Sequence, residues 1–279
     1  MNNLVLAMDD SRRDALKRKI ERIRTMTMQR EQFIPEFSTP PDGIQCQRCG
    51  NTGWIYTVDA NGYENVIACP DCYERRQVVR RLRHSGINPK DYARFTLRSF
   101  DPAKTPDSQK MLAMAKRYID EHVSGGPGFG VFGSSGMGKT HIGIAVCQEL
   151  TRRYHEPHFY FSYRSIMPGL VKAAKSFQGD YEQAMQKWET CQNLYIDDVF
   201  KFSGKLVAGA GKIVIDQDEL RVFFDLINAR YLNRRTTLFS SEYSVNEIAA
   251  IDGALGSRMY DMIKPYGLAV SGPNQRLVG

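Results

Sequence analysis

Residues 128–140 read GFGVFGSSGMGKT and contain the pattern GxxxxGK[ST]. An apolar stretch precedes this loop, and residues 141–154 carry a helical pattern after it. A glycine-rich loop between a strand and a helix lets backbone N–H groups surround the phosphates of a nucleotide. In this pattern Lys139 reaches the β- and γ-phosphates, and the Thr140 hydroxyl is a ligand of Mg²⁺. The predicted phosphate-binding residues are Gly133, Ser134, Ser135, Gly136, Met137, Gly138, Lys139 and Thr140.

Two further predicted strands also end in polar residues. Residues 193–198 read NLYIDD, an apolar strand that ends in Asp197 and Asp198. We expect Asp197 to hold Mg²⁺ and Asp198 to polarise the attacking water, although aspartates at a strand end can also cap a helix. Residues 236–242 read TTLFSSE and end in Glu242. Because ligands bind at the carboxyl ends of strands in open parallel sheets, the three strand ends predict one nucleotide site in an α/β domain.

A separate cysteine module lies upstream of this domain. Its spacing is Cys46-x₂-Cys49, then 19 residues, then Cys69-x₂-Cys72. Four thiolates at this spacing can surround one Zn²⁺ tetrahedrally, which predicts a closed, structural zinc site. Two unrelated CxxC pairs, or a redox pair, are the alternatives. Trp54, Tyr56, Val66 and Ile67 are candidates for the two short strands of a zinc ribbon.

The remaining segments suggest three parts. Residues 9–33 have helical periodicity and are followed by prolines, which predicts an N-terminal arm and linker over residues 1–45. Residues 46–88 are expected to hold the cysteine module and a basic amphipathic helix over residues 73–84. Residues 89–279 are expected to form the ATPase part, in which the stretch to about residue 106 looks like a connector and strands and helices alternate from about residue 108. The arm either docks on a partner protein or packs on its own domain.

Composition excludes several classes of protein. With 42% hydrophobic and 25% charged residues, the 279-residue chain is neither wholly disordered nor collagen-like. The net charge of +7 is concentrated in residues 46–100, which is compatible with a nucleic-acid partner. No apolar run approaches the roughly 18–20 residues that span a bilayer, and the first residues do not resemble a secretory signal. We therefore expect a cytoplasmic protein with no membrane partner.

These features together resemble the bacterial and phage replicative helicase loaders of the DnaC/DnaI type, which belong to the AAA+ superfamily. The resemblance covers residues 46–279. It rests on the cysteine module, the phosphate loop, Asp197-Asp198 and four shorter segments: Ile227-Asn-Ala-Arg-Tyr231, Ser240-Ser241-Glu242, Gly256-Ser-Arg-Met259 and Gly272-Pro-Asn-Gln-Arg276.

The resemblance implies a P-loop AAA+ parallel-sheet ATPase domain without a helical lid, preceded by a small zinc-binding module and an N-terminal helix. It implies slow ATP hydrolysis, with ATP, Mg²⁺ and Zn²⁺ as cofactors. The implied partners are a hexameric replicative helicase, single-stranded DNA and further copies of the chain that meet at the ATP sites. Arg258 occupies the position of an arginine finger that reaches a neighbour's nucleotide. Arg276 occupies the sensor-2 position, which touches the γ-phosphate in the same subunit.

Two departures from the family pattern stand out. The sensor-1 position, commonly Asn, is Glu242, and a carboxylate there repels the γ-phosphate unless it holds a water, a metal-bound group or an arginine. Residues 200–216 form a Gly- and Lys-rich stretch that is longer than the usual turn after the Asp-Asp strand. This length favours the phage-borne branch of the family. The basic segment 75–83 and the lysines and aromatic residues of the later loops are candidate DNA contacts, although we expect the aromatic residues to be core. These loop residues are Lys201, Lys205 and Lys212, with Tyr163, Phe177 and Phe202.

Two competing functions remain open from the sequence. A transposition helper ATPase of the IstB type shares the ATPase core, but the cysteine module argues against it. A zinc-dependent scaffold with a vestigial nucleotide site is the other alternative. The intact Lys139, Thr140, Asp197 and Asp198 argue against a vestigial site.

Overall fold

The computed structural model describes residues 42–58, 63–176, 180–201, 203, 205–206, 213–275 and 277. The chain divides into two compact units, residues 1–72 and 73–279. Residues 1–41, most of the arm expected over residues 1–45, lie outside the described residues. The same is true of Phe177, Phe202, Lys212 and Arg276. The domain boundaries expected at residues 45/46 and 88/89 stay predictions.

The first unit holds a small antiparallel ribbon. Strand β1 (Trp54–Val58) pairs with β2 (Glu64–Ala68), with Trp54 opposite Ala68. The two CxxC pairs stand just before β1 and just after β2. The two short strands expected over these residues are therefore confirmed.

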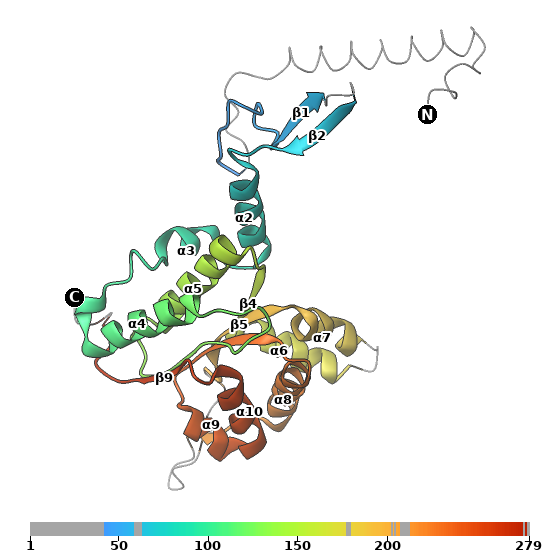
Figure 1. Cartoon of the computed structure of the whole chain (residues 1–279). Coiled ribbons are helices and arrows are strands. Elements are labelled where there is room, and N and C mark those ends of the chain that lie inside the picture. The colour runs from blue at the N-terminus through green and yellow to red at the C-terminus, as the bar shows by residue number, and fades with distance from the viewer. Residues whose placement is uncertain are drawn as a thin grey trace. The chain divides into compact units, whose positions relative to one another are not determined.

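The second unit is built on a parallel five-stranded sheet in the order β4-β5-β8-β3-β9 (Figure 1). The strands are β3 (Gly130–Gly133), β4 (His158–Ser162), β5 (Asn193–Val199), β8 (Thr236–Ser241) and β9 (Gly267–Val270). The helices are α2 (Tyr73–His84), α3 (Pro89–Arg94), α4 (Pro106–Asp120), α5 (Lys139–Tyr154), α6 (Tyr163–Ala174), α7 (Asp180–Thr190), α8 (Gln217–Leu232), α9 (Val245–Ile251) and α10 (Gly253–Ile263), with the 3₁₀ turn η1 (Pro102–Lys104). The expected parallel-sheet α/β fold is confirmed.

Helices cover both faces of this sheet, so the strands are apolar on both sides. In β5, Leu194 and Ile196 join the core beneath α6 to α10, whereas Tyr195 between them joins the core beneath α4 and α5. This alternation follows from successive strand side chains pointing to opposite faces. Burial on both faces is typical of parallel sheets and explains the near-continuous apolar runs in the sequence.

The expected connector between α2 and α4 is more ordered than a linker. Asn88 caps α3 by accepting a hydrogen bond from the Lys90 N–H at 2.9 Å, and Pro89 occupies the first turn. Thr105 caps α4 in the same way through the Ser108 N–H, at 3.0 Å. Prolines are favoured in a first helical turn because no intrahelical partner is lost there, so the prolines that suggested a connector instead start helices.

The long stretch after β5 carries a short antiparallel pair, β6 (Lys205–Leu206) with β7 (Ile213–Val214). Asp216 then caps α8 by accepting from the N–H groups of Asp218 and Glu219. The described part of the stretch expected over residues 200–216 thus includes an antiparallel strand pair before α8.

Candidate functional site

The phosphate loop joins β3 to α5, as the sequence predicted. Gly138, the N-cap residue just before α5, has φ 85°, a left-handed conformation that glycine adopts without strain. A Cβ on Gly133 would lie 1.8 Å from the Val270 carbonyl oxygen of the neighbouring strand β9, so the backbone needs a glycine there. These two positions explain why the loop can turn tightly at the end of β3.

Lys139 lies inside the loop. Its ammonium donates hydrogen bonds to the carbonyl oxygens of Gly133 and Ser134, at 2.7 and 2.8 Å, and the residue is 5% exposed. Burial lowers the pKa of Lys139, and the nearby charges of Glu242, Asp198 and Asp197 oppose that shift. A cation is therefore held at the place where the motif needs one for phosphates.

Asp197 accepts hydrogen bonds from four hydroxyl groups. Its Oδ1 receives Thr140 at 3.1 Å, Tyr195 at 2.6 Å and Ser240 at 2.5 Å, and its Oδ2 receives Tyr160 at 2.7 Å. The residue is only 4% exposed. Hydrogen bonds to a charged group are worth about 1.5–3 kcal/mol each, which offsets much of the cost of burying a carboxylate. Thr140 and Asp197, the two predicted Mg²⁺ ligands, are thus direct neighbours.

Asp198 sits in an irregularity of β5. The register of β5 against β8 shifts between Ile196 and Val199, and Asp198 has φ 58°. Its N–H donates to the Ser240 Oγ at 2.9 Å, so the same serine contacts both aspartates. Burial and the charge of Asp197 raise the pKa of Asp198, although its contact with Lys201 opposes the rise.

Glu242 follows β8 and lies at the same edge of the sheet. Its Oε1 is 3.2 Å from the Lys201 ammonium, and its side chain lies close enough to Ser135 of the phosphate loop for that hydroxyl to affect its pKa. Partial burial raises the pKa of Glu242, but the stronger combined effect of Lys201 and Ser135 lowers it below its usual value. The partner of this unexpected carboxylate is therefore a lysine.

Sequence reasoning missed the hydroxyl groups around Asp197. Tyr195 stands two residues before Asp197, so strand alternation places both side chains on one face of β5. Gly143 on α5 makes room for it, because a Cβ there would lie 2.5 Å from the Tyr195 hydroxyl oxygen. Tyr160 pairs with Tyr195 in the β4–β5 register, a contact that no local pattern reveals.

The segment after β9 returns to the phosphate loop. The Ser271 N–H donates to Asp107 at 2.8 Å, and Asn274 packs so closely on Gly136 that a Cβ there would lie 1.8 Å from the Asn274 Oδ1. This segment precedes Arg276, whose sensor-2 role stays a prediction.

Arg258 lies on α10 and contacts α8. Its guanidinium stands over the rings of Phe224 and Tyr231, 5.0 and 5.7 Å from their centres, and it donates to the Ala254 carbonyl oxygen at 3.1 Å. These contacts hold the Arg258 side chain against α8 and α10 of its own subunit. Its role as an arginine finger stays a prediction.

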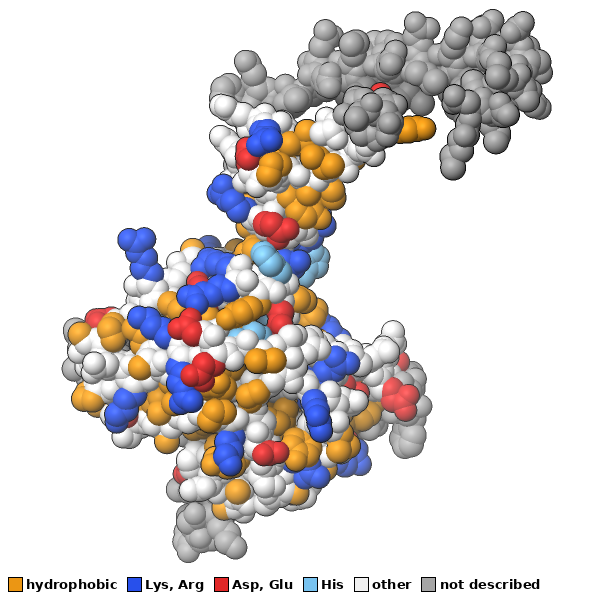
Figure 2. Space-filling view, in the orientation of Figure 1, with side chains coloured by type: hydrophobic (Ala, Val, Ile, Leu, Met, Phe, Trp, Pro, Cys, Tyr) orange, Lys and Arg blue, Asp and Glu red, His pale blue; other side chains and the backbone are white. Residues whose placement is uncertain are grey.

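The candidate DNA contacts fall into different settings. Tyr163 is 1% exposed and donates to Glu219 at 2.8 Å, so it belongs to the core, as expected. Lys201 is held by two carboxylates. Arg75, Arg80 and Arg83 on α2 are exposed. On the face that Figure 2 shows, Lys and Arg side chains of the second unit are interspersed with acidic and apolar ones.

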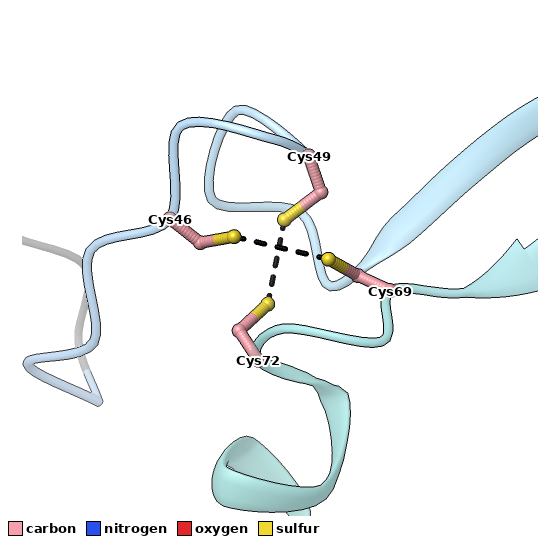
Figure 3. A group of neighbouring side chains, drawn as sticks. All are labelled: Cys46, Cys49, Cys69 and Cys72. Carbon is pink, nitrogen blue, oxygen red and sulfur yellow. Dashed lines mark hydrogen bonds between the residues drawn. The ribbon is translucent and has the colours of Figure 1, made fainter.

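In the first unit, the four cysteines converge on one point. Figure 3 shows their sulfurs facing a common centre from the loops before β1 and after β2. The Cys46–Cys69 and Cys49–Cys72 sulfur pairs are 3.8 and 3.4 Å apart, and all four sulfurs lie within 4.8 Å of one another. Tetrahedral Zn²⁺ with Zn–S bonds of about 2.3 Å needs sulfurs about 3.8 Å apart. The cluster therefore has the dimensions of a zinc site.

The loop around Cys49 favours the thiolate form that a metal needs. Gly53 donates its N–H to the Cys49 sulfur at 3.3 Å, and Asn51 closes the turn by accepting the Cys46 N–H at 2.7 Å. Desolvation by burial raises the pKa of Cys49, but hydrogen bonds from Gly53 and the three other thiols lower it to about 6. The four cysteines could therefore hold a metal ion.

Comparison with known families decides the relationship. The family model described as the bacterial DnaA ATPase domain matches residues 98–264. The chain belongs to this family. The match begins before α4 and ends just after α10, so it includes the phosphate loop, Asp197, Asp198 and Glu242.

Further similarities agree with this DnaA-family assignment. The phage-like element PBSX protein XkdC of Bacillus subtilis (strain 168) is 28% identical over 246 residues, which cover 84% of this chain and 86% of XkdC. The crystal structure of DnaI matches with a TM-score of 0.50 and 20% identity, over 68% of this chain and 95% of that one. The DnaC helicase loader matches with a TM-score of 0.52 and 17% identity, over 65% of this chain and 99% of that one. The second unit thus has the fold of DnaC and DnaI.

Among the residues that the structure describes, no helix combines the length and the apolar character of a membrane-spanning segment.

Proposed function

We propose that the chain is an ATP-dependent loader that binds the hexameric replicative helicase and helps place it on single-stranded DNA when replication begins. The observation that carries this proposal is the likeness of its ATPase domain to the DnaC helicase loader over 99% of that chain. The contact between Thr140 and Asp197 supports a working nucleotide site rather than a vestigial one.

We propose a role for each side chain of the site. Lys139 and the loop N–H groups bind the β- and γ-phosphates of ATP, and Thr140 with Asp197 would hold Mg²⁺, which neutralises phosphate charge. Asp198 polarises the attacking water, and Glu242 pairs with Lys201 beside the phosphate loop. ATP acts mainly as a switch for assembly, so turnover is slow.

Two further contacts would complete the loader. Arg258 reaches the nucleotide of a neighbouring copy, and Arg276 touches the γ-phosphate of its own subunit. The exposed arginines of α2 meet the phosphate backbone of single-stranded DNA, to which clustered cations bind without sequence preference.

The test is copurification from the host with ATP present and absent. The proposal expects the replicative helicase as the main partner, identified by mass spectrometry, and more of it with ATP than without. A transposase in its place would support the helper ATPase of the IstB type and contradict the proposal.

We also propose that Cys46, Cys49, Cys69 and Cys72 bind one structural Zn²⁺. Metal binding is worth about 10–16 kcal/mol in zinc-finger peptides, so the ribbon should unfold without it. Cys69→Ser should lower zinc from about one ion per chain to none, measured by elemental analysis, and abolish helicase binding while nucleotide binding survives. Cys191→Ser, outside the cluster, is the control and should keep its zinc. Full zinc occupancy in Cys69→Ser would contradict the assignment.

A further inference from the structure

Lys201 connects three parts of the nucleotide site. Its ammonium lies 2.8 Å from the Asp198 Oδ2 and 3.2 Å from the Glu242 Oε1. Ser135 of the phosphate loop lies close enough to Glu242 to help lower the pKa of that carboxyl. Lys201 thus joins the end of β5 to the end of β8, beside the phosphate loop.

The backbone fixes Lys201 in this place. Phe200, the preceding residue, is fully buried and packs edge-on against the rings of Tyr163 and Phe223. The Lys201 N–H donates to the Asp198 carbonyl oxygen at 3.0 Å, which closes a tight turn. With Phe200 anchored in the core, the turn returns the Lys201 side chain to the carboxylates, where it is only 20% exposed.

The balance of charge explains what such a lysine does. Three carboxylates, those of Asp197, Asp198 and Glu242, gather at the edge of the sheet where the phosphates of ATP should lie. Among the described residues, Lys201 contacts two of these carboxylates, and Lys139 in the phosphate loop lies near enough for all three charges to affect its pKa. Like charges brought together at partly buried positions repel strongly, so Asp198 and Glu242 without Lys201 would oppose a further anionic phosphate.

We propose that Lys201 is a positioning residue of the ATP site: it neutralises Asp198 and Glu242 and thereby allows the γ-phosphate to bind beside them. This inference rests on the proposed ATP-dependent function. Lys201 thus serves the nucleotide site rather than the DNA backbone, and Glu242 serves as its second anchor. The effect is specific for a triphosphate, because the γ-phosphate is the group nearest the residue that polarises water.

The experiment measures the affinities of Mg²⁺-ADP and of a Mg²⁺-bound non-hydrolysable ATP analogue by titration calorimetry. The variants are Lys201→Met, Lys201→Arg, Glu242→Gln and the double change Lys201→Met with Glu242→Gln. Lys175→Met is the matched control, because Lys175 is an exposed lysine paired with Asp218 on α8.

Lys201→Met should lower the affinity for the ATP analogue about tenfold or more and change the affinity for ADP less than about threefold. Lys201→Arg and Lys175→Met should resemble the wild type. Adding Glu242→Gln to Lys201→Met should recover part of the loss, because one of the two uncompensated charges is then removed.

Equal losses for ATP and ADP, or a double variant that is no better than Lys201→Met, would overturn the inference. Because Glu242→Gln and Lys201→Arg alter the same contact conservatively, the comparison survives even if Lys201→Met folds poorly. A wild-type chain that binds no ATP would instead contradict the proposed function itself.

Discussion

Lys139→Ala should abolish nucleotide binding. The ammonium of Lys139 is held inside the phosphate loop by the carbonyl oxygens of Gly133 and Ser134, so its charge is already placed for the β- and γ-phosphates. Removing one partner of a buried, hydrogen-bonded charge pair costs about 2–5 kcal/mol, which weakens affinity about 30-fold to several thousand-fold. Titration calorimetry with Mg²⁺-ATP measures the loss.

Lys116→Ala is the control for this change. Lys116 is an exposed lysine on α4, so its loss should leave ATP affinity within about twofold of the wild type. Lys139→Ala should keep its fold and its zinc, because the loop is far in sequence from the cysteines. Undiminished ATP affinity in Lys139→Ala would mean that the loop does not bind phosphate.

Arg258→Ala should bind ATP normally and lose hydrolysis that depends on assembly. In the subunit described here, Arg258 contacts Phe224, Tyr231 and the Ala254 carbonyl oxygen, so its removal spares the chain's own phosphate loop. Arginine fingers supplied by a partner are worth about 10³–10⁵ in rate in GTPases, and we expect a smaller loss in a switch protein. Phosphate release at increasing protein concentration, and with helicase added, measures it. Arg221→Ala, an exposed arginine on the neighbouring α8, is the control.

Mixing two inactive variants tests whether neighbouring subunits share a site. Lys139→Ala keeps Arg258 but lacks a working loop, whereas Arg258→Ala keeps the loop but lacks the finger. Recovered hydrolysis in the mixture supports a site built from two subunits. If Arg258→Ala alone matches the wild type under assembling conditions, Arg258 is an ordinary surface arginine.

Short sequence patterns predicted those parts of the site whose residues are neighbours in the sequence. The phosphate loop, the two aspartates after a strand and the paired cysteines each show in a few consecutive residues. Their convergence followed from one rule, that parallel strands end at the same edge of a sheet. The strand predicted over residues 193–198 matches β5 (Asn193–Val199) because its apolar run is buried on both faces.

The contacts that tune the site could not be predicted because they join distant residues. Lys201 and Glu242 meet only because β5 and β8 are neighbours, and a lysine in a Gly- and Lys-rich stretch gives no sign of its partner. Tyr160 reaches Asp197 from a third strand, β4. The bulge at Asp198 likewise depends on the β5–β8 register, which sequence alone does not fix.

The most direct test of the proposed loader is helicase placement on closed circular single-stranded DNA, which has no end for a ring to thread. The purified host helicase and the chain are mixed with this DNA, with ATP or without, and DNA-bound helicase is recovered by gel filtration and quantified. The loader proposal predicts that the wild-type chain with ATP raises DNA-bound helicase well above helicase alone, whereas Lys139→Ala does not. Equal amounts of DNA-bound helicase with the wild-type chain, with Lys139→Ala and with no added chain would contradict it.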